Sequence, residues 1–382
     1  MRIFKDGFIG TLAIAGLLAA GMWYAQALDM QRWAQVAIHS GDVSRVAALP
    51  PISVSQVHWS ADGQLLLALS RGEFSAEGFI AVYDTAQKSG RIPIDVMGQS
   101  IASAALAPDG RHVLASTYQG HLWWINLESF DSAWLAELPR PSRFGATAIA
   151  PAGRFVAAAT DTGSIYLYDT AEQTLMMILS TDRRSSVGKL RFSPDGTQLL
   201  NCYNDGTIGL FDLATGTLLQ EFKGHGPAVS GAEFLADGAR IISVGFDDSV
   251  RIWEIASGRE VWRGEFSLSG VKSLAVSADG KTAAWGGFSR KIIIWDLLRG
   301  QKKCEISTPA SVVNNLNFSP DGMLLAAAGT EGTIRIYNLL TGAEEPGIDV
   351  GLPQNHGALH LNRGDLADDF IPAKPNSVPS KG

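Results

Sequence analysis

The residues best suited to catalysis or metal binding are scattered along this 382-residue chain. Its seven histidines are His39, His58, His112, His121, His225, His356 and His360. None of them pairs with Cys, Asp or Glu at the spacing of a metal site. The spacing of His356 and His360 is interpreted as adventitious, because both follow the repeated part of the chain. The sequence therefore predicts no metal and no cofactor.

Nucleophiles and nucleotide-binding motifs are equally uninformative. No nucleophile elbow, phosphate-binding loop or dinucleotide fingerprint stands between a strand and a helix. The two cysteines, Cys202 and Cys304, fall two repeats apart and at different positions within them, so they are expected to be buried, unpaired thiols. These observations favour a protein that is not an enzyme.

Composition limits the classes of partner that the protein is expected to bind. The net charge is −7, and the nearest approach to a basic cluster is Arg183-Arg184, which suits a solvated loop tip. Because phosphate binding needs clustered Lys and Arg, nucleic acid is excluded as a main partner. Hydrophobic residues make up 46 %, which is enough for a substantial core.

The elements that would position any site follow from an internal repeat. A turn signature of the form Pro/Ala–Asp/Ala–Gly recurs seven times, and its glycines are 47, 43, 43, 42, 42 and 42 residues apart. The seven glycines are Gly63, Gly110, Gly153, Gly196, Gly238, Gly280 and Gly322. A second marker, a large apolar residue followed by an acid or amide, keeps almost the same period. Its copies are Tyr83-Asp84, Ile125-Asn126, Tyr168-Asp169, Phe211-Asp212, Trp253-Glu254, Trp295-Asp296 and Tyr337-Asn338.

Each copy has the pattern of four short strands, with apolar residues alternating before the turn. A single sheet of this kind cannot bury both of its faces, but seven of them stacked radially shield one another. The sequence therefore predicts an all-β, seven-bladed β-propeller of four-stranded antiparallel blades over residues 44–350. Ring closure is expected to use one chain end as the outer strand of the last blade. Val43–Ala48 is favoured over Gly347–Val350 for that strand.

The N-terminus carries an apolar run from Phe8 to Ala25 that is long enough, as a helix, to span most of a bilayer. Arg2 and Lys5 precede it, and Trp23-Tyr24 stand where an interfacial belt would lie. We expect one transmembrane helix, a signal anchor within residues 1–28, that leaves the N-terminus in the cytoplasm. The propeller is then periplasmic or extracellular, after a linker over 29–43.

Two alternatives remain for this segment. Ala25-Gln26-Ala27 has the form of a signal-peptidase site, so cleavage after Ala27 would yield a secreted protein. The apolar run is longer than the usual core of a signal peptide, which favours the anchor. A buried helix of the globular domain is the other alternative. Residues 351–382, rich in Pro, Asn, Gly and Asp, are expected to form a flexible tail.

The repeat resembles the WD-repeat family of β-propellers over roughly residues 44–345, and the fifth copy is the best match. There, Gly224-His225 is followed by Ser243, Asp247, Trp253 and Glu254. The resemblance implies that His225, Ser243, Asp247 and Trp253 form a hydrogen-bonded structural tetrad, which would stiffen the blade. Elsewhere the turn aspartate survives only as Asp205, and its equivalents are Gln119, Thr162, Ser289 and Glu331.

The resemblance also implies that protein partners dock on the loop-rich face, beside the position just before that turn aspartate. The candidates are Tyr118, Asp161, Asn204, Phe246, Phe288 and Thr330, with Arg290 as a further charged contact. Aromatic side chains on a rigid rim are good interface anchors. The alternative is that Phe246 and Phe288 pack between neighbouring blades. The favoured function is a non-catalytic protein–protein interaction scaffold.

The alternative function is a propeller enzyme, a hydrolase or a quinoprotein-like dehydrogenase, with its site at the central channel. Arg191 and Glu233 occupy the same inner-strand position in adjacent copies, and His58 and Asn317 occupy it in the first and last. They could reach a ligand in the channel. The favoured interpretation is a charge pair between blades, since an unpaired charge there is costly.

Overall fold

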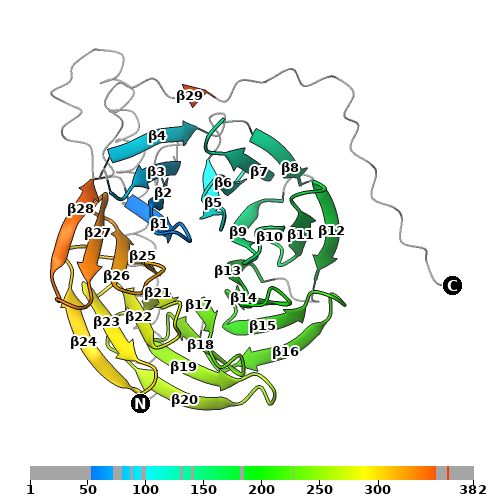
Figure 1. Cartoon of the computed structure of the whole chain (residues 1–382). Helices are drawn as coiled ribbons and strands as arrows, with labels where there is room; N and C mark the ends of the chain where they lie inside the picture. The colour runs from blue at the N-terminus through cyan, green and yellow to red at the C-terminus, as the bar shows by residue number, and fades with distance from the viewer. Residues whose placement is uncertain are drawn as a thin grey trace, which may run out of the picture.

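The computed structural model describes residues 53–71, 80–86, 89–95, 100–129, 132–138, 142–180, 185–226, 228–349 and 359–360. They form seven sheets arranged in a ring around a central channel, and each blade has four antiparallel strands in chain order from the channel outward (Figure 1). The sheet of the first blade carries one further, two-residue strand at its outer edge. The predicted all-β, seven-bladed propeller is confirmed.

Strands of five to seven residues build every blade. The first three blades are β1 (Ser53–Trp59), β2 (Leu65–Arg71), β3 (Ile80–Asp84) and β4 (Ser89–Asp95); β5 (Ile101–Leu106), β6 (His112–Thr117), β7 (His121–Asn126) and β8 (Ser132–Glu137); β9 (Phe144–Ile149), β10 (Phe155–Thr160), β11 (Ile165–Asp169) and β12 (Thr174–Leu179). The next two are β13 (Val187–Phe192), β14 (Gln198–Tyr203), β15 (Thr207–Asp212) and β16 (Leu218–Lys223); β17 (Val229–Phe234), β18 (Arg240–Gly245), β19 (Ser249–Glu254) and β20 (Glu260–Glu265). The last two are β21 (Val271–Val276), β22 (Thr282–Gly287), β23 (Lys291–Asp296) and β24 (Gln301–Ser307); β25 (Val313–Phe318), β26 (Leu324–Gly329), β27 (Thr333–Asn338) and β28 (Glu344–Asp349).

The repeated glycine turn joins the first and second strands of each blade. In the seventh blade, Ser319 Oγ donates a hydrogen bond of 2.5 Å to Asp321 Oδ1, which also accepts the N–H of Met323 at 2.9 Å. Gly322 completes the turn at a φ of 71°, a left-handed conformation that glycine adopts without steric cost. The signature is therefore a local device that reverses the chain at the same point of every repeat.

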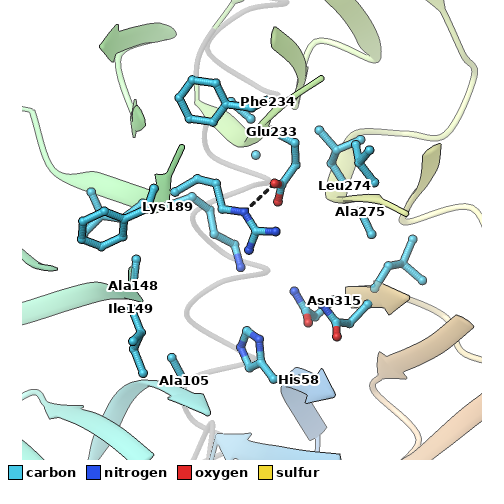
Figure 2. Close-up of a pocket in the computed structure, with 18 of the residues that line it drawn as sticks. His58, Ala105, Ala148, Ile149, Lys189, Glu233, Phe234, Leu274, Ala275 and Asn315 are labelled. Carbon is cyan, nitrogen blue, oxygen red and sulfur yellow. Dashed lines mark ion pairs between the residues drawn. The ribbon is translucent and has the colours of Figure 1, made fainter. Parts of the chain in front are cut away.

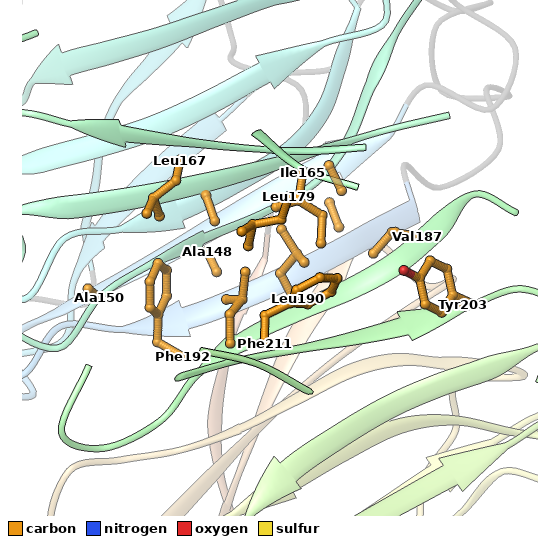
Figure 3. Packing of buried hydrophobic residues seen from close by; sticks show 14 residues of the cluster. Ala148, Ala150, Ile165, Leu167, Leu179, Val187, Leu190, Phe192, Tyr203 and Phe211 are labelled. Atoms are coloured by element: carbon orange, nitrogen blue, oxygen red, sulfur yellow. The ribbon is translucent and has the colours of Figure 1, made fainter. Parts of the chain in front are cut away.

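The hydrophobic core lies at the seams between the blades. The described residues form seven buried clusters, and each combines side chains from two neighbouring blades. At the seam of the third and fourth blades, for example, Ile165 and Leu167 pack with Leu190 and Phe192 (Figure 3). Because each sheet buries its apolar faces against its neighbours, removal of one blade would expose two clusters.

All four strands of the seventh blade come from the last repeat, so the expectation that an N-terminal segment supplies its outer strand was wrong. The C-terminal β28 is the outer strand of the seventh blade, in the place for which Val43–Ala48 was favoured. Instead, side chains of β25 bind the backbone of β1: Asn315 Oδ1 accepts the N–H of Val57 at 3.0 Å, and Asn317 Oδ1 accepts that of Trp59 at 2.9 Å. These bonds satisfy donors on the channel edge of β1, which has no strand beside it there.

Two further features concern the ends of the chain. A short strand, β29 (Leu359–His360), lies in the predicted tail and pairs in parallel with the outer edge of β4. The apolar run Phe8–Ala25, the linker and Ala27 lie outside the described residues. Within the described part of the chain, no helix is long and apolar enough to cross a membrane.

Cys202 is buried and unpaired, as expected, but Cys304 is exposed on β24. The prediction for Cys304 was wrong because an outermost strand has no neighbouring strand on its far side to cover it.

Candidate functional site

The candidate partner residues all lie at turns between the second and third strands of their blades. Since every blade has the same strand order, these turns project from one face of the ring, here called the loop face. Its rim positions are Tyr118, Asp161, Asn204, Phe246, Phe288 and Thr330. Thr330 is partly buried, and the other five side chains are exposed.

The two phenylalanines form an aromatic pair on the loop face. Their ring centroids are 6.1 Å apart, and 42 % of Phe246 and 41 % of Phe288 remain exposed. A side chain at Gly270 would meet both rings, so that glycine, at a φ of 104°, leaves the space in which they sit. The pair thus packs across the seam of the fifth and sixth blades and still presents apolar surface.

A cation lies beside this pair. Lys272 Nζ is 5.6 Å from the ring centroid of Phe288 and donates a hydrogen bond of 2.6 Å to Asn314 Oδ1. Asn314 in turn binds the carbonyl of Val54 at 2.9 Å, so the contact continues across the closing seam. The surface offers an apolar anchor with a positive charge next to it, a combination that suits an aromatic or apolar side chain near a carboxylate.

The backbone around the pair is held in an uncommon conformation. Asp248 and Arg290, two residues after the phenylalanines, have φ values of 61° and 59°, and Ser269 has 57°. Asp248 Oδ1 accepts the N–H of Gly270 at 2.6 Å, which ties the turn of the fifth blade to the loop entering the sixth. Such left-handed residues persist only where surrounding contacts fix them, so this part of the rim is preorganised.

The tetrad of the fifth blade lies directly beneath this rim. Trp253 Nε1 donates to Ser243 Oγ at 2.8 Å, Ser243 Oγ lies 2.8 Å from His225 Nε2, and His225 Nδ1 lies 3.0 Å from Asp247 Oδ1. Asp247 also accepts the N–H of Gly226 at 2.9 Å. The four side chains thus form one hydrogen-bonded chain that fixes the loop before the first strand.

Charge stabilises the same network. Arg251, almost fully buried, donates to Asp247 Oδ2 at 3.1 Å and to Glu260 Oε2 at 2.7 Å. Burial alone would raise the pKa of Asp247, but hydrogen bonds from Gly226, His225 and Ser249 outweigh it and hold that pKa well below its ordinary value. Burial lowers the pKa of His225, against the opposing attraction of Asp247. Asp247 is therefore an anion and His225 a neutral imidazole at neutral pH.

Ser243, His225 and Asp247 have the connectivity of a hydrolytic triad, which makes their surroundings decisive. Ser243 is fully buried, and its oxygen is already an acceptor for Trp253. A substrate carbonyl has no path to that oxygen in this conformation. The arrangement is a structural clamp and does not support the alternative of a hydrolase.

Two side chains at the tetrad serine position were missed by sequence reasoning. The equivalents of Ser243 are Asn201 in the fourth blade and Trp285 in the sixth, and both are fully buried. Among the described residues, the amide of Asn201 and the indole N–H of Trp285 have no hydrogen-bond partner. The period of 42–43 residues places them at this position, so the repeat alignment could have found them.

The central channel holds the predicted charge pair. Arg191 Nε lies 2.6 Å from Glu233 Oε2, and the two come from the inner strands of the fourth and fifth blades. Lys189, His58 and Asn315 point into the same cavity of about 460 Å³ (Figure 2). Burial, with the nearby charges of Lys189 and Arg191, lowers the pKa of His58 to about 3. The interblade pair is present, and the imidazole beside it is neutral.

Among the residues that the structure describes, no group of three or more His, Cys, Asp or Glu side chains is placed to hold a metal ion.

Comparison with known families agrees with this geometry. Residues 132–267 match the family model described as Vps8 beta-propeller, and residues 300–338 match the WD domain, G-beta repeat. The sequence matches no curated protein. The fold is a seven-bladed β-propeller. These matches and the seven four-stranded blades together support a WD-repeat β-propeller, a fold typical of protein-interaction scaffolds.

Proposed function

We propose that this protein is a non-catalytic scaffold, anchored in a membrane by its N-terminal segment, which binds protein partners through the loop face. The observation that carries the proposal is the Phe246–Phe288 pair. Two aromatic rings with about two fifths of their surface exposed lie on a preorganised rim, with Lys272 beside them. Aromatic groups in such a setting are the usual anchors of a protein interface.

The membrane part of the proposal is supported by sequence. Phe8–Ala25 has the length and apolarity of a membrane-spanning helix, and Arg2 and Lys5 before it favour an N-terminus in the cytoplasm. The propeller would then face the periplasm or the cell exterior. Carbonate extraction of membranes tests the anchor: an uncleaved anchor stays in the pellet, whereas cleavage after Ala27 releases a shorter, soluble chain.

The partner face is tested with Phe246→Ala combined with Phe288→Ala in the full-length chain. In-cell crosslinking and mass spectrometry define the proteins captured by the wild type, and the same proteins are quantified with the variant. We expect at least a tenfold loss of capture, because truncation of two central anchors removes about 2 kcal/mol or more of binding energy.

The matched control is Leu298→Ala combined with Leu340→Ala. These leucines are the most exposed large apolar side chains of the described part of the chain, at 74 % each, and lie in turns at the opposite ends of the strands. The control should capture partners as the wild type does. A melting temperature that collapses in the phenylalanine variant would show that the rings are core, and equal capture by both variants would refute the loop face as the interface.

A further inference from the structure

The outermost strand of each blade is an edge with no strand of its own blade on its far side, and six of the seven share a protective feature. They contain charged residues, which oppose pairing with another chain. These residues are Arg91 and Asp95 in β4; Glu137 in β8; Glu221 and Lys223 in β16; Glu260, Arg263 and Glu265 in β20; Lys302, Lys303 and Glu305 in β24; and Glu344, Glu345 and Asp349 in β28. The outer strand of the third blade, β12, has none.

The sequence of β12 is Thr-Leu-Met-Met-Ile-Leu, without charge or proline. Leu175, Met176 and Ile178 are 43 %, 47 % and 48 % exposed. Among the strands that the structure describes, β12 is hydrogen-bonded to β11 alone, so its outer row of backbone groups faces away from the sheet. A strand with exposed apolar side chains and a vacant backbone edge is suited to strand addition.

Another blade of this protein already accepts an added strand. In the first blade, β29 pairs with the outer edge of β4, with Leu359 opposite Ile94 and His360 opposite Asp95 (Figure 1). The outer edge of a blade is therefore accessible to a strand, and the ring geometry does not obstruct pairing there.

We propose that β12 is a self-association edge, at which β12 of a second copy of this chain pairs antiparallel to form one continuous eight-stranded sheet. The distribution of charge over the outer strands favours a second copy of this chain as the partner of β12. An uncharged edge meets its own copy without like-charge repulsion, whereas self-pairing at β28 would bring its three carboxylates against three more. Antiparallel pairing of identical strands gives a closed two-fold dimer, in which both edges are used and no further copy can add.

Oligomeric state tests the proposal. The full-length protein in mild detergent is studied by sedimentation velocity over a hundredfold range of concentration. We expect a reversible dimer in the wild type. Met176→Lys combined with Ile178→Lys should raise the dimer dissociation constant at least a hundredfold, because four ammonium groups would enter the paired region.

The matched control places two lysines on the outer strands of the fourth and fifth blades, as Leu219→Lys in β16 and Val261→Lys in β20. Both side chains are as exposed as those of β12, at 48 % and 53 %. The control should dimerise as the wild type does, with slower hydrogen exchange of β12 amides at high concentration. A monomeric wild type at every concentration, or a dimer that the β12 lysines leave intact, overturns the proposal.

Discussion

The fifth and sixth blades have opposite chemistry, polar in one and aromatic in the other, at equivalent positions of the repeat. Both must fix the loop that enters their first strand, and both use the same three positions of the repeat. The fifth blade has Ser243, Asp247 and Trp253 there, and the sixth has Trp285, Ser289 and Trp295. The first set is a hydrogen-bonded network with a partly buried carboxylate, and the second is the centre of an aromatic cluster.

Geometry shows how the aromatic version works. The ring centroid of Trp285 lies 4.9 Å from Phe266 and 5.5 Å from Trp295, and Trp295 lies 5.3 Å from Trp262. The loop entering the sixth blade is fixed from outside, since Asp248 of the fifth blade binds the N–H of Gly270. A blade can therefore lose its tetrad if apolar packing and a neighbouring turn replace it. The two repeats thus share the buried position, but the interactions made there differ.

The largest effect in this comparison should come from Trp285→Ala. The side chain is fully buried among Phe266 and Trp295, so truncation leaves a cavity and removes two aromatic contacts. We expect a loss of about 4 kcal/mol in the free energy of unfolding, measured by denaturant titration. Trp285→Phe, which keeps most of the volume and removes an N–H that has no partner, should cost less than half as much. Equal costs would show that the indole is not packed as described.

The turn between the second and third strands offers a second comparison of the fifth and sixth blades. Asp247→Ala should cost about 3 kcal/mol, because it leaves Arg251 and His225 buried without their common partner. Ser289→Ala, the same position one blade later, should change stability by less than about 0.5 kcal/mol, because the Ser289 hydroxyl is buried with no hydrogen-bond partner. Thermal unfolding of the two single variants measures both values. Similar losses would mean that the sixth blade relies on a polar contact at this turn.

The sequence predicted the propeller because the fold depends on periodicity. Two markers with nearly the same period indicate four strands in each copy. Because a single sheet of this kind cannot bury both of its faces, the copies must stack against one another. The tetrad residues could also be named from their spacing, since the fifth copy retains all four. The channel pair Arg191–Glu233 followed from equivalent positions on adjacent inner strands.

Ring closure and the aromatic cluster could not be predicted in the same way. Closure depends on Asn315 and Asn317 reaching the backbone of β1, a contact between residues about 258 positions apart. No local pattern marks such a pair. The cluster around Trp285 combines residues of two blades, and a repeat alignment shows only that a serine has become a tryptophan. Whether the loop-face residues bind a partner stays a prediction, because exposure alone does not distinguish an anchor from a half-covered side chain.

The smallest expected effect is a difference between the two blades in how their stability depends on pH. The pKa of His225 is lowered from its ordinary 6.5 and that of Asp247 from its ordinary 3.8, so at acidic pH the unfolded chain binds protons that the folded chain does not. Stability that is complete above about pH 6.5 must therefore fall as the pH drops, by up to about 1.4 kcal/mol per pH unit for each such histidine. His58 contributes with the same sign, since its pKa is lowered to about 3.

Denaturant titrations at pH 7, 6 and 5 measure this dependence. His225→Asn and His58→Asn should each reduce the slope, and each variant serves as the control for the other. Hydrogen exchange, corrected for its intrinsic pH dependence, should show protection falling first in β18 and β19, while β22 and β23 of the aromatic blade keep theirs. A wild-type stability that stays flat between pH 7 and 5 would contradict the assignment of neutral imidazoles at His225 and His58. Equal loss of protection in both blades would mean that acid weakens the ring as a whole and that the tetrad is not its point of sensitivity.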